Sequence, residues 1–441
     1  MRKKQIIIVS LALLLIVVSG IFFNSDSNVI AGDKQLAAGG MTSFNRTYAA
    51  FEPPAEGLNE VELARHLESD PLFDRSHIPL DDHLNAGLGP LHNANSCSSC
   101  HILNGRGRPV IGQSLFRVAM KENGGVDPVP FIGFQLQDKA TYGYEPEAVI
   151  IREWIEASNL RQLQTTITTP GGEELSTRDV ARSLRVAPPL VGLGLLEAIP
   201  QEEIISNADP DDLDGDGISG RVVWSKDEKE TTLVGRFGWK AQSPTLHQQS
   251  VDAYNEDMGI TTPIASSTTL TNEGAPADLS WQELVDVTYY SQTLPAPATG
   301  ELSNSSITRK GFKIFNQLQC SSCHIPQQKT GFNSDAVASV INNQTIWPYT
   351  DLLVHDMGPG LDDGVAEHGL TKSGEWRTSP LWGIGLTKRV NYYVGFLHDG
   401  RARSIEEAIL WHGGEANASR SAYEDLNDKD KNNLLKWLDQ L

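Results

Sequence analysis

The chain has 441 residues, enough for two or three domains, and a formal net charge of −20. This charge argues against a nucleic-acid-binding protein, because phosphates are bound by clustered Lys and Arg, and beyond the first few residues the sequence has no such cluster. The acidity would suit docking to a basic partner, although its general effect is solubility.

The first 31 residues have the pattern of a secretory signal peptide. A basic stretch over 2–4 precedes an apolar run over 6–23, and residues 29–31 supply a cleavage site. The apolar run is close to the length of a membrane span, so an uncleaved N-terminal anchor is the alternative. Both interpretations place the rest of the chain outside the cytoplasm, and we expect it in the periplasm.

The pentapeptide Cys-Ser-Ser-Cys-His occurs twice, at 97–101 and at 320–324, and the two copies use all four cysteines of the chain. C-x-x-C-H is the attachment pattern of c-type haem, in which both thiols form thioethers and the histidine ligates the iron. The sequence therefore predicts two covalently bound c-type haems. The residues expected to hold them are Cys97, Cys100, His101, Cys320, Cys323 and His324.

Other uses of paired cysteines fit less well. A zinc ribbon places its two pairs much closer in sequence and gives no reason for the trailing histidine. A redox dithiol would explain one copy rather than two, and a disulfide within each copy would close too short a loop to stabilise much. Covalent haem also agrees with export, because c-type haem is attached outside the cytoplasm.

The stretch 110–235 reads as an insertion. Short alternating segments such as 148–151, separated by Gly and Pro turns, predict a mixed α/β or loop-rich fold there. Within it, Asp212, Asp214 and Asp216 match the first half of a calcium-binding loop. The twelfth loop position is Val223 rather than Glu, so a surface turn rich in Asp and Gly is the alternative.

Two later segments, 279–294 and 426–441, predict amphipathic helices, each downstream of a haem motif. Small c-type cytochrome domains end in such a helix. We therefore expect a mainly α protein with two cytochrome c-like haem domains. The first would span 40–300 and carry the insertion, and the second would span 301–441.

The segment 396–408, which begins Phe-Leu-His-Asp-Gly-Arg, resembles bacterial di-haem cytochrome c peroxidases and, more closely, the related di-haem oxidoreductases. In the peroxidases the second axial ligand of the C-terminal haem lies fourteen residues after this histidine. Counting from His398, that position is His412. The resemblance implies a haem ligated by His324 and His412, with Met357 as the alternative second ligand.

A second stretch is also similar to the peroxidases. Residues 239–249 and 255–259 resemble segments that supply an aromatic residue between the haems and an acid over the open iron. The resemblance implies that Trp239 bridges the haems and that Asp257 or Glu256 is the acid. The second segment is one residue shorter here, so the choice between the two acids stays open. Such an acid would move a proton during cleavage of a peroxide O–O bond.

These features predict an exported di-haem oxidoreductase that reduces hydrogen peroxide at the His101 haem. Electrons would enter at the His324 haem from a soluble cytochrome c or a copper protein. One alternative is a non-catalytic electron-transfer protein with both irons fully ligated. Another is haem-dependent oxidation of a protein or thiol substrate, which would use the same open iron.

Overall fold

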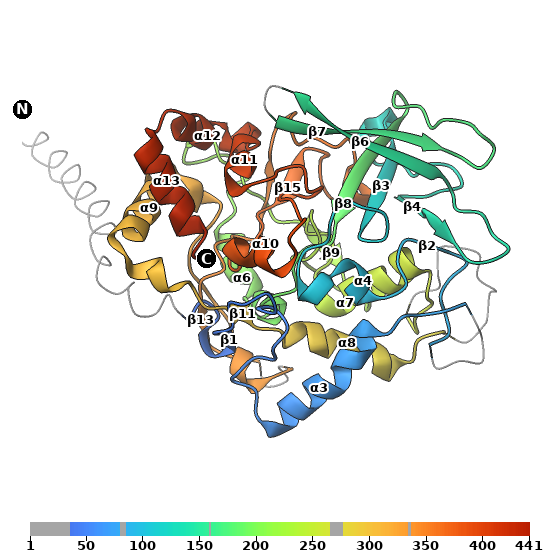
Figure 1. Ribbon diagram of the computed structural model, residues 1–441, viewed down its shortest axis with the longest axis horizontal. Coiled ribbons are helices and arrows are strands. Elements are labelled where there is room, and N and C mark those ends of the chain that lie inside the picture. Colours follow the sequence, from blue (N-terminus) through green and yellow to red (C-terminus); the bar gives the residue numbers. More distant parts are fainter. Residues whose placement is uncertain (1–35, 80–84, 158–159, 265–276, 334–336) are drawn as a thin grey trace, which may run out of the picture.

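A computed structural model describes residues 36–79, 85–157, 160–264, 277–333 and 337–441 (Figure 1). The predicted signal peptide or anchor over 1–31 lies outside these residues. Within the described ranges, no helix has the length and apolar character to cross a membrane.

The first haem motif lies on a group of four helices, α3 (Glu60–Asp74), α4 (Cys97–Cys100), α7 (Leu246–Asp252) and α8 (Trp281–Gln292). Helix α8 packs against both α3 and α7. It begins at Ser280, whose hydroxyl accepts from the Glu283 amide while the Glu283 carboxylate accepts from the Ser280 amide. Cys97 and Cys100 pack against the apolar core of this group.

The second motif lies beside another helical group, at the left of Figure 1, formed by α9 (Ser306–Gln317), α11 (Ile405–Leu410), α12 (Asn417–Glu424) and α13 (Asp428–Leu438). Helices α9 and α13 approach closely at Gly311, where a Cβ atom would lie 2.2 Å from the Asn433 carbonyl oxygen. Phe315 and Trp437 fill the interface with ring centroids 4.8 Å apart. Cys320 packs against this core.

Strands occupy much of the predicted insertion. β3 (Ser114–Met120) is the centre of a three-stranded antiparallel sheet with β4 (Gln135–Leu136) and β8 (Val180–Val186). β6 (Val149–Ala157) and β7 (Leu160–Thr168) form a long antiparallel hairpin above it in Figure 1.

The remaining strands are short and pair two by two. They are β1 (Thr42–Ser43), β2 (Leu91–His92), β5 (Lys139–Ala140), β9 (Trp224–Lys226), β10 (Thr232–Val234), β11 (Ala296–Pro297), β12 (Gln328–Lys329), β13 (Thr345–Ile346), β14 (Val354–Asp356) and β15 (Glu375–Arg377). Three short helices, α5 (Leu193–Glu197), α6 (Gln201–Ser206) and α10 (Thr387–Val390), complete the main elements.

The expectation of a mainly α protein is wrong, because the described chain is mixed α/β. Strands lie in the region of the second motif as well as in the insertion, where β12 to β15 fall between α9 and α11. Strands of two or three residues are too short to show a two-residue alternation of apolar side chains. The sequence pattern therefore favoured the longer helices that flank them.

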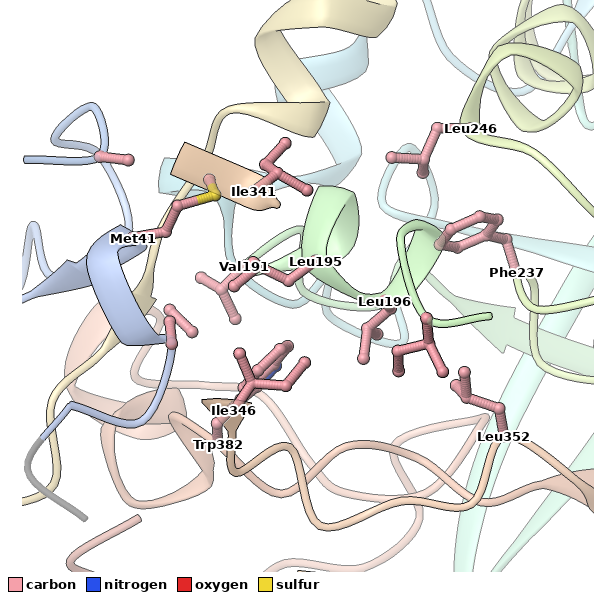
Figure 2. Close-up of a cluster of buried hydrophobic side chains, with 14 of the residues drawn as sticks. Met41, Val191, Leu195, Leu196, Phe237, Leu246, Ile341, Ile346, Leu352 and Trp382 are labelled. Atoms are coloured by element: carbon pink, nitrogen blue, oxygen red, sulfur yellow. The ribbon is translucent and has the colours of Figure 1, made fainter. Parts of the chain in front are cut away.

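Segments distant in sequence share one apolar core, shown in Figure 2. The N-terminal segment contributes Met41, the middle of the chain Leu195 and Leu196, and the C-terminal region Ile346 and Trp382. The N-terminal strand β1 also pairs in parallel with β11. This core joins the N-terminal, middle and C-terminal parts of the chain.

Truncation in this shared core is expected to destabilise the whole protein. Leu195 is fully buried, so Leu195→Ala should lower the free energy of unfolding by about 2–5 kcal/mol. The matched control is Leu67→Ala on α3, where the side chain is 55% exposed and the change should stay within about 0.5 kcal/mol. Denaturant unfolding measures both variants, and equal effects would contradict this description of the core.

Candidate functional site

One cavity of about 760 Å³ is bordered by both Cys-Ser-Ser-Cys-His motifs. It also brings together every residue that the sequence assigned to haem or to catalysis, although these residues lie far apart along the chain. Those residues are Cys97, Cys100, His101, Trp239, Glu256, Asp257, Cys320, Cys323, His324 and His412.

The three candidate iron ligands share one arrangement. Nδ1 of His101 lies 2.8 Å from the Pro188 carbonyl oxygen, and Nδ1 of His324 lies 3.0 Å from that of Tyr349. Nδ1 of His412 lies 2.7 Å from the Ala408 carbonyl oxygen in the preceding helix. An Nδ1–H that donates to a carbonyl leaves Nε2 with its lone pair for a metal.

Burial keeps these imidazoles neutral. It lowers the pKa of His101 and of His324 to about 4 and also lowers the pKa of His412. A neutral imidazole is the form that ligates iron. The chemistry of these donors therefore fits one haem at each motif, with His412 available as a second ligand beside His324.

The four cysteines are free thiols rather than disulfides. Burial raises the pKa of Cys97, Cys100 and Cys320 to about 12. Helix α4 begins at Ser96, whose hydroxyl accepts from the Ser99 amide, and its single turn sets both thiols of the first motif at the cavity wall. This arrangement suits thioether formation.

Two buried arginines would complete the haem sites. Arg106 and Arg377 border the cavity, and burial lowers the pKa of each guanidinium to about 10. In the described part of the chain, Nε and Nη2 of Arg106 have no hydrogen-bond partner. A haem carries two propionates, and these unpartnered donors are suited to bind them. The residues that line the cavity therefore fit a bound haem.

Trp239 lines the cavity and is fixed there by its contacts. Its indole N–H donates to the Val186 carbonyl oxygen at 2.8 Å. The Arg106 guanidinium lies over the ring, 5.0 Å from its centroid. Trp239 also packs against the apolar cluster that contains Trp376 and Trp411. The structure thus places Trp239 on the same cavity as both motifs.

Asp257 is an acid that lines this cavity. Burial raises the pKa of its carboxyl to about 7, against the opposing effect of the hydrogen bond from Gln135 Nε2 to Oδ1 at 2.8 Å. Asp257 ends a single π-helical turn, Ala253–Asp257, that follows α7. Such turns are rare and occur frequently at functional sites. A carboxyl with a pKa near neutrality can both accept and return a proton.

The neighbouring acids are placed differently. Oε2 of Glu256 lies 2.5 Å from Nη1 of Arg117, so this carboxylate forms an ion pair. Asp252 is buried too, with its pKa raised to about 6, but both of its oxygens accept hydrogen bonds from Ser243 and Gln248. The geometry favours Asp257 as the residue that exchanges protons.

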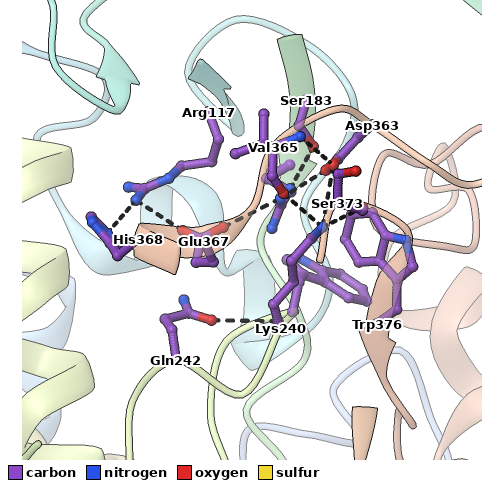
Figure 3. Close-up of polar contacts among 12 residues, drawn as sticks. Arg117, Ser183, Lys240, Gln242, Asp363, Val365, Glu367, His368, Ser373 and Trp376 are labelled. Carbon is purple, nitrogen blue, oxygen red and sulfur yellow. Dashed lines mark hydrogen bonds and ion pairs between the residues drawn. The ribbon is translucent and has the colours of Figure 1, made fainter. Parts of the chain in front are cut away.

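A buried ionic network that the sequence did not predict lies beside these acids (Figure 3). Nη2 of Arg117 lies 2.8 Å from Glu367 and 2.8 Å from Nε2 of His368. Burial alone would raise the pKa of Glu367, but Arg117 and Arg185 outweigh it and lower the pKa to about 2. The ion pairs extend through Arg185 to Asp363.

Lys240 completes this network. It is fully buried and donates to Asp363 and to two backbone carbonyls, while its ammonium lies 4.3 Å from the Trp376 ring centroid. Lys240 lies in the segment 239–249, but the resemblance of this segment to the peroxidases implied no role for it. Arg117 and Glu367 belong to segments without a motif.

The second motif has its own buried cation. Nε2 of His355 lies 2.9 Å from Asp351, and Nδ1 lies 2.7 Å from Glu415 and 3.6 Å from the Cys323 sulfur. Burial would lower the pKa of His355, but the hydrogen bonds from Asp351, Cys323 and Glu415 raise it to about 12. A protonated imidazole therefore lies beside the second motif.

The aspartate-rich loop lies outside the cavity. The carboxylates of Asp209, Asp212 and Asp214 have oxygens within 4.8 Å of one another. Asp216 is not part of this group, and its Oδ1 accepts from the Ile218 amide instead. The structure thus gathers two of the three predicted calcium ligands and adds Asp209.

A single cavity with two C-x-x-C-H motifs and three neutral, buried histidines defines a protein of the di-haem class. The chain belongs to the family described as "Di-haem oxidoreductase, putative peroxidase", whose model matches residues 33–132 and 162–441. The family resemblance stated from the sequence is therefore confirmed.

Two further comparisons add little. Among solved structures, the chain is similar to the hydrazine synthase of Kuenenia stuttgartiensis pressurised with xenon, at 14% identity and a TM-score of 0.35. The similarity covers 89% of this chain and 94% of the other. Comparison with curated proteins found no match.

Proposed function

We propose that the protein reduces hydrogen peroxide to water at the haem ligated by His101, with Asp257 as the proton-transfer residue. The observation that carries this proposal is the asymmetry of the cavity. Beside His101 it presents a buried carboxyl whose pKa is raised to about 7, whereas beside His324 it presents the neutral imidazole of His412. One site is suited to chemistry and the other to electron transfer.

The chain's own residues have separate roles in proton transfer. A bound haem would supply the site for peroxide and the electrons for cleavage of its O–O bond. Asp257 accepts a proton from the near oxygen of the peroxide and returns it to the far oxygen, which leaves as water. Gln135 orients this carboxyl, and Arg117 pairs with the other acid, Glu256.

Electron delivery uses the other half of the cavity. We propose that both haems are attached covalently, that His324 and His412 ligate the second, and that Trp239 lies on the path between them. The donor is a small soluble cytochrome c or copper protein outside the cytoplasm, in keeping with the signal-like residues 1–31. Two electrons and two protons convert one hydrogen peroxide into two water molecules.

The direct test is peroxide consumption by the di-haem protein with a reduced mediator as electron source. We expect turnover that depends on both haems. Holoprotein that binds two haems yet leaves peroxide unchanged would contradict the proposal and favour a non-catalytic electron carrier. Turnover of a protein or thiol substrate in the absence of peroxide consumption would favour the other alternative.

We propose separately that the aspartate-rich loop binds calcium. The gathered oxygens of Asp209, Asp212 and Asp214 support a hard cation there. Calcium at about 100 times its Kd should stabilise the fold by about 2.7 kcal/mol, which thermal unfolding detects as a higher Tm. Asp212→Asn/Asp214→Asn should abolish the shift, while Asp216→Asn should reduce it less. An equal shift with magnesium, or none with calcium, would contradict the site.

A further inference from the structure

A basic and aromatic patch lies on the surface over the cavity. We define it by Arg46, Lys388, Arg389, Tyr392 and Tyr393. The two tyrosines are 75% and 73% exposed, and their rings meet edge to face with centroids 5.1 Å apart. Neighbouring aromatic side chains that remain in water are typical of surfaces that bind other proteins.

The patch is positive in a strongly negative molecule. Nη1 of Arg389 donates to the Arg46 carbonyl oxygen at 2.7 Å, and Nζ of Lys388 donates to the carbonyl oxygen of Arg403. In the part of the chain that the structure describes, none of the patch cations forms an ion pair with a carboxylate. Asp439 is the acid whose charge reaches Arg46 and Arg389. Arg46 and Arg389 therefore share Asp439 as a nearby carboxylate.

The patch is separated from the cavity by one short helix. Helix α10 (Thr387–Val390) has Thr387 at the cavity wall, while the next two residues are exposed. The side-chain amide of Asn391 donates to the Arg106 carbonyl oxygen at 3.0 Å, so the patch also adjoins the loop after the first motif. In Figure 1, α10 lies at the front of the molecule near the C-terminus.

From this placement we propose that the patch docks a small electron-transfer protein whose exposed cofactor edge is surrounded by carboxylates. The acidic composition of the whole chain would suit a basic partner, but the local charge at the patch is positive and suits an acidic one. The net charge of −20 repels an acidic partner from other faces and thereby concentrates productive encounters at the patch. The cations orient the acidic rim, and the tyrosines exclude water from the centre of the contact.

This inference rests on the proposed function, which needs an electron donor. Each docking event oxidises the partner by one electron and reduces one haem iron from ferric to ferrous. Two events supply the two electrons that, with two protons, convert one hydrogen peroxide into two water molecules.

The test is stopped-flow reduction of the di-haem protein, without peroxide, by reduced flavodoxin, an acidic protein with an exposed flavin edge. We expect a rate that falls as salt rises, and Lys388→Glu/Arg389→Glu should lower it about tenfold at low salt. The control Lys121→Glu/Arg178→Glu makes the same charge change at an exposed site at the far end of β3, where Lys121 donates to the Thr177 carbonyl. The reduction rate of this control variant should stay within about twofold of the wild-type rate.

Equal rates for the wild type and the patch variant would overturn the proposal. Reduction by dithionite, which needs no docking, should be the same in all three proteins, and a slower rate in the patch variant would also count against docking, since the haem site itself would then be altered. The outcome is separable from the proposed function. Patch-dependent reduction without peroxide turnover would contradict that function alone.

Discussion

Asp257→Asn is expected to lower kcat/KM for hydrogen peroxide by about 10²–10⁴-fold, the usual contribution of a positioned acid–base group. The amide has nearly the shape of the carboxyl and can still bond to Gln135, but it cannot accept the peroxide proton. Both haems and their spectra should remain intact. Steady-state peroxide consumption with a small-molecule reductant measures the effect without the protein donor.

The pH dependence gives this prediction a second readout. Because the pKa of Asp257 is raised to about 7 and the ionised form accepts the proton, wild-type kcat/KM should rise as the pH increases through 7. Asp257→Asn should lose this transition. A folded-state pKa above the unfolded value also means that ionisation costs stability as the pH rises, so above pH 7 the variant should be at least as stable as the wild type.

Two neighbours provide matched controls. Asp252→Asn removes another buried carboxyl with a raised pKa, and Glu256→Gln removes the partner of Arg117. Each should lower kcat/KM by less than about tenfold. A loss of peroxide reduction in either variant as large as that in Asp257→Asn would transfer the proton-exchanging role to that residue.

His412→Gly is expected to convert the second haem from six-coordinate low spin to an open, high-spin site, because the only imidazole proposed to face His324 is removed. Optical and EPR spectra of the ferric protein report this change directly. Added imidazole should restore the low-spin spectrum by entering the space left by the side chain. Electron transfer from a protein donor should fall by at least about tenfold as the reorganisation of an open site slows it.

Met357→Leu is the matched control for this ligand, since Met357 borders the same cavity. The loop that carries it packs directly on Gly413 and Gly414, next to His412. The low-spin spectrum should survive this substitution. If Met357→Leu opened the second haem and His412→Gly did not, the ligand would be the Met357 sulfur. The prediction of His412 from the fourteen-residue spacing would then be wrong.

The sequence predicted best what depends on short, local patterns. The two haem motifs, the capped helix at α8 (Trp281–Gln292) and the terminal helix α13 (Asp428–Leu438) are found where expected. Their signals lie within a few turns of chain. The strands β12 to β15 carry no such signal, because strands this short bury too few side chains to produce a readable alternation.

The sequence could not predict the residues that act through tertiary contacts. Arg117 lies opposite Gln135 across β3 and β4, and this pairing sets both side chains beside Asp257 and Glu256. No spacing along the chain links them to Glu367 or to the second motif. The choice between the two acids also needed the structure, since it depends on which carboxylate meets Arg117. The grouping of Asp209 with Asp212 and Asp214, without Asp216, also depends on how the loop folds.

The two identical pentapeptides lie in different surroundings. The carboxylate of Asp257 acts on Cys97 and Cys100 of the first motif, whereas the imidazole of His412 acts on His324 of the second. His355, whose pKa is raised, lies beside the second motif between the carboxylates of Asp351 and Glu415. We propose that this difference makes the first haem the site of chemistry and the second the site of electron entry.

The central claim is that one haem is open and the other is closed, and cyanide titration of the diferric protein followed by EPR tests it most directly. The account predicts one low-spin signal from a centre with two imidazole ligands that cyanide leaves unchanged. It also predicts one high-spin signal that is converted by a single equivalent of cyanide. Two low-spin signals that both resist cyanide would contradict it.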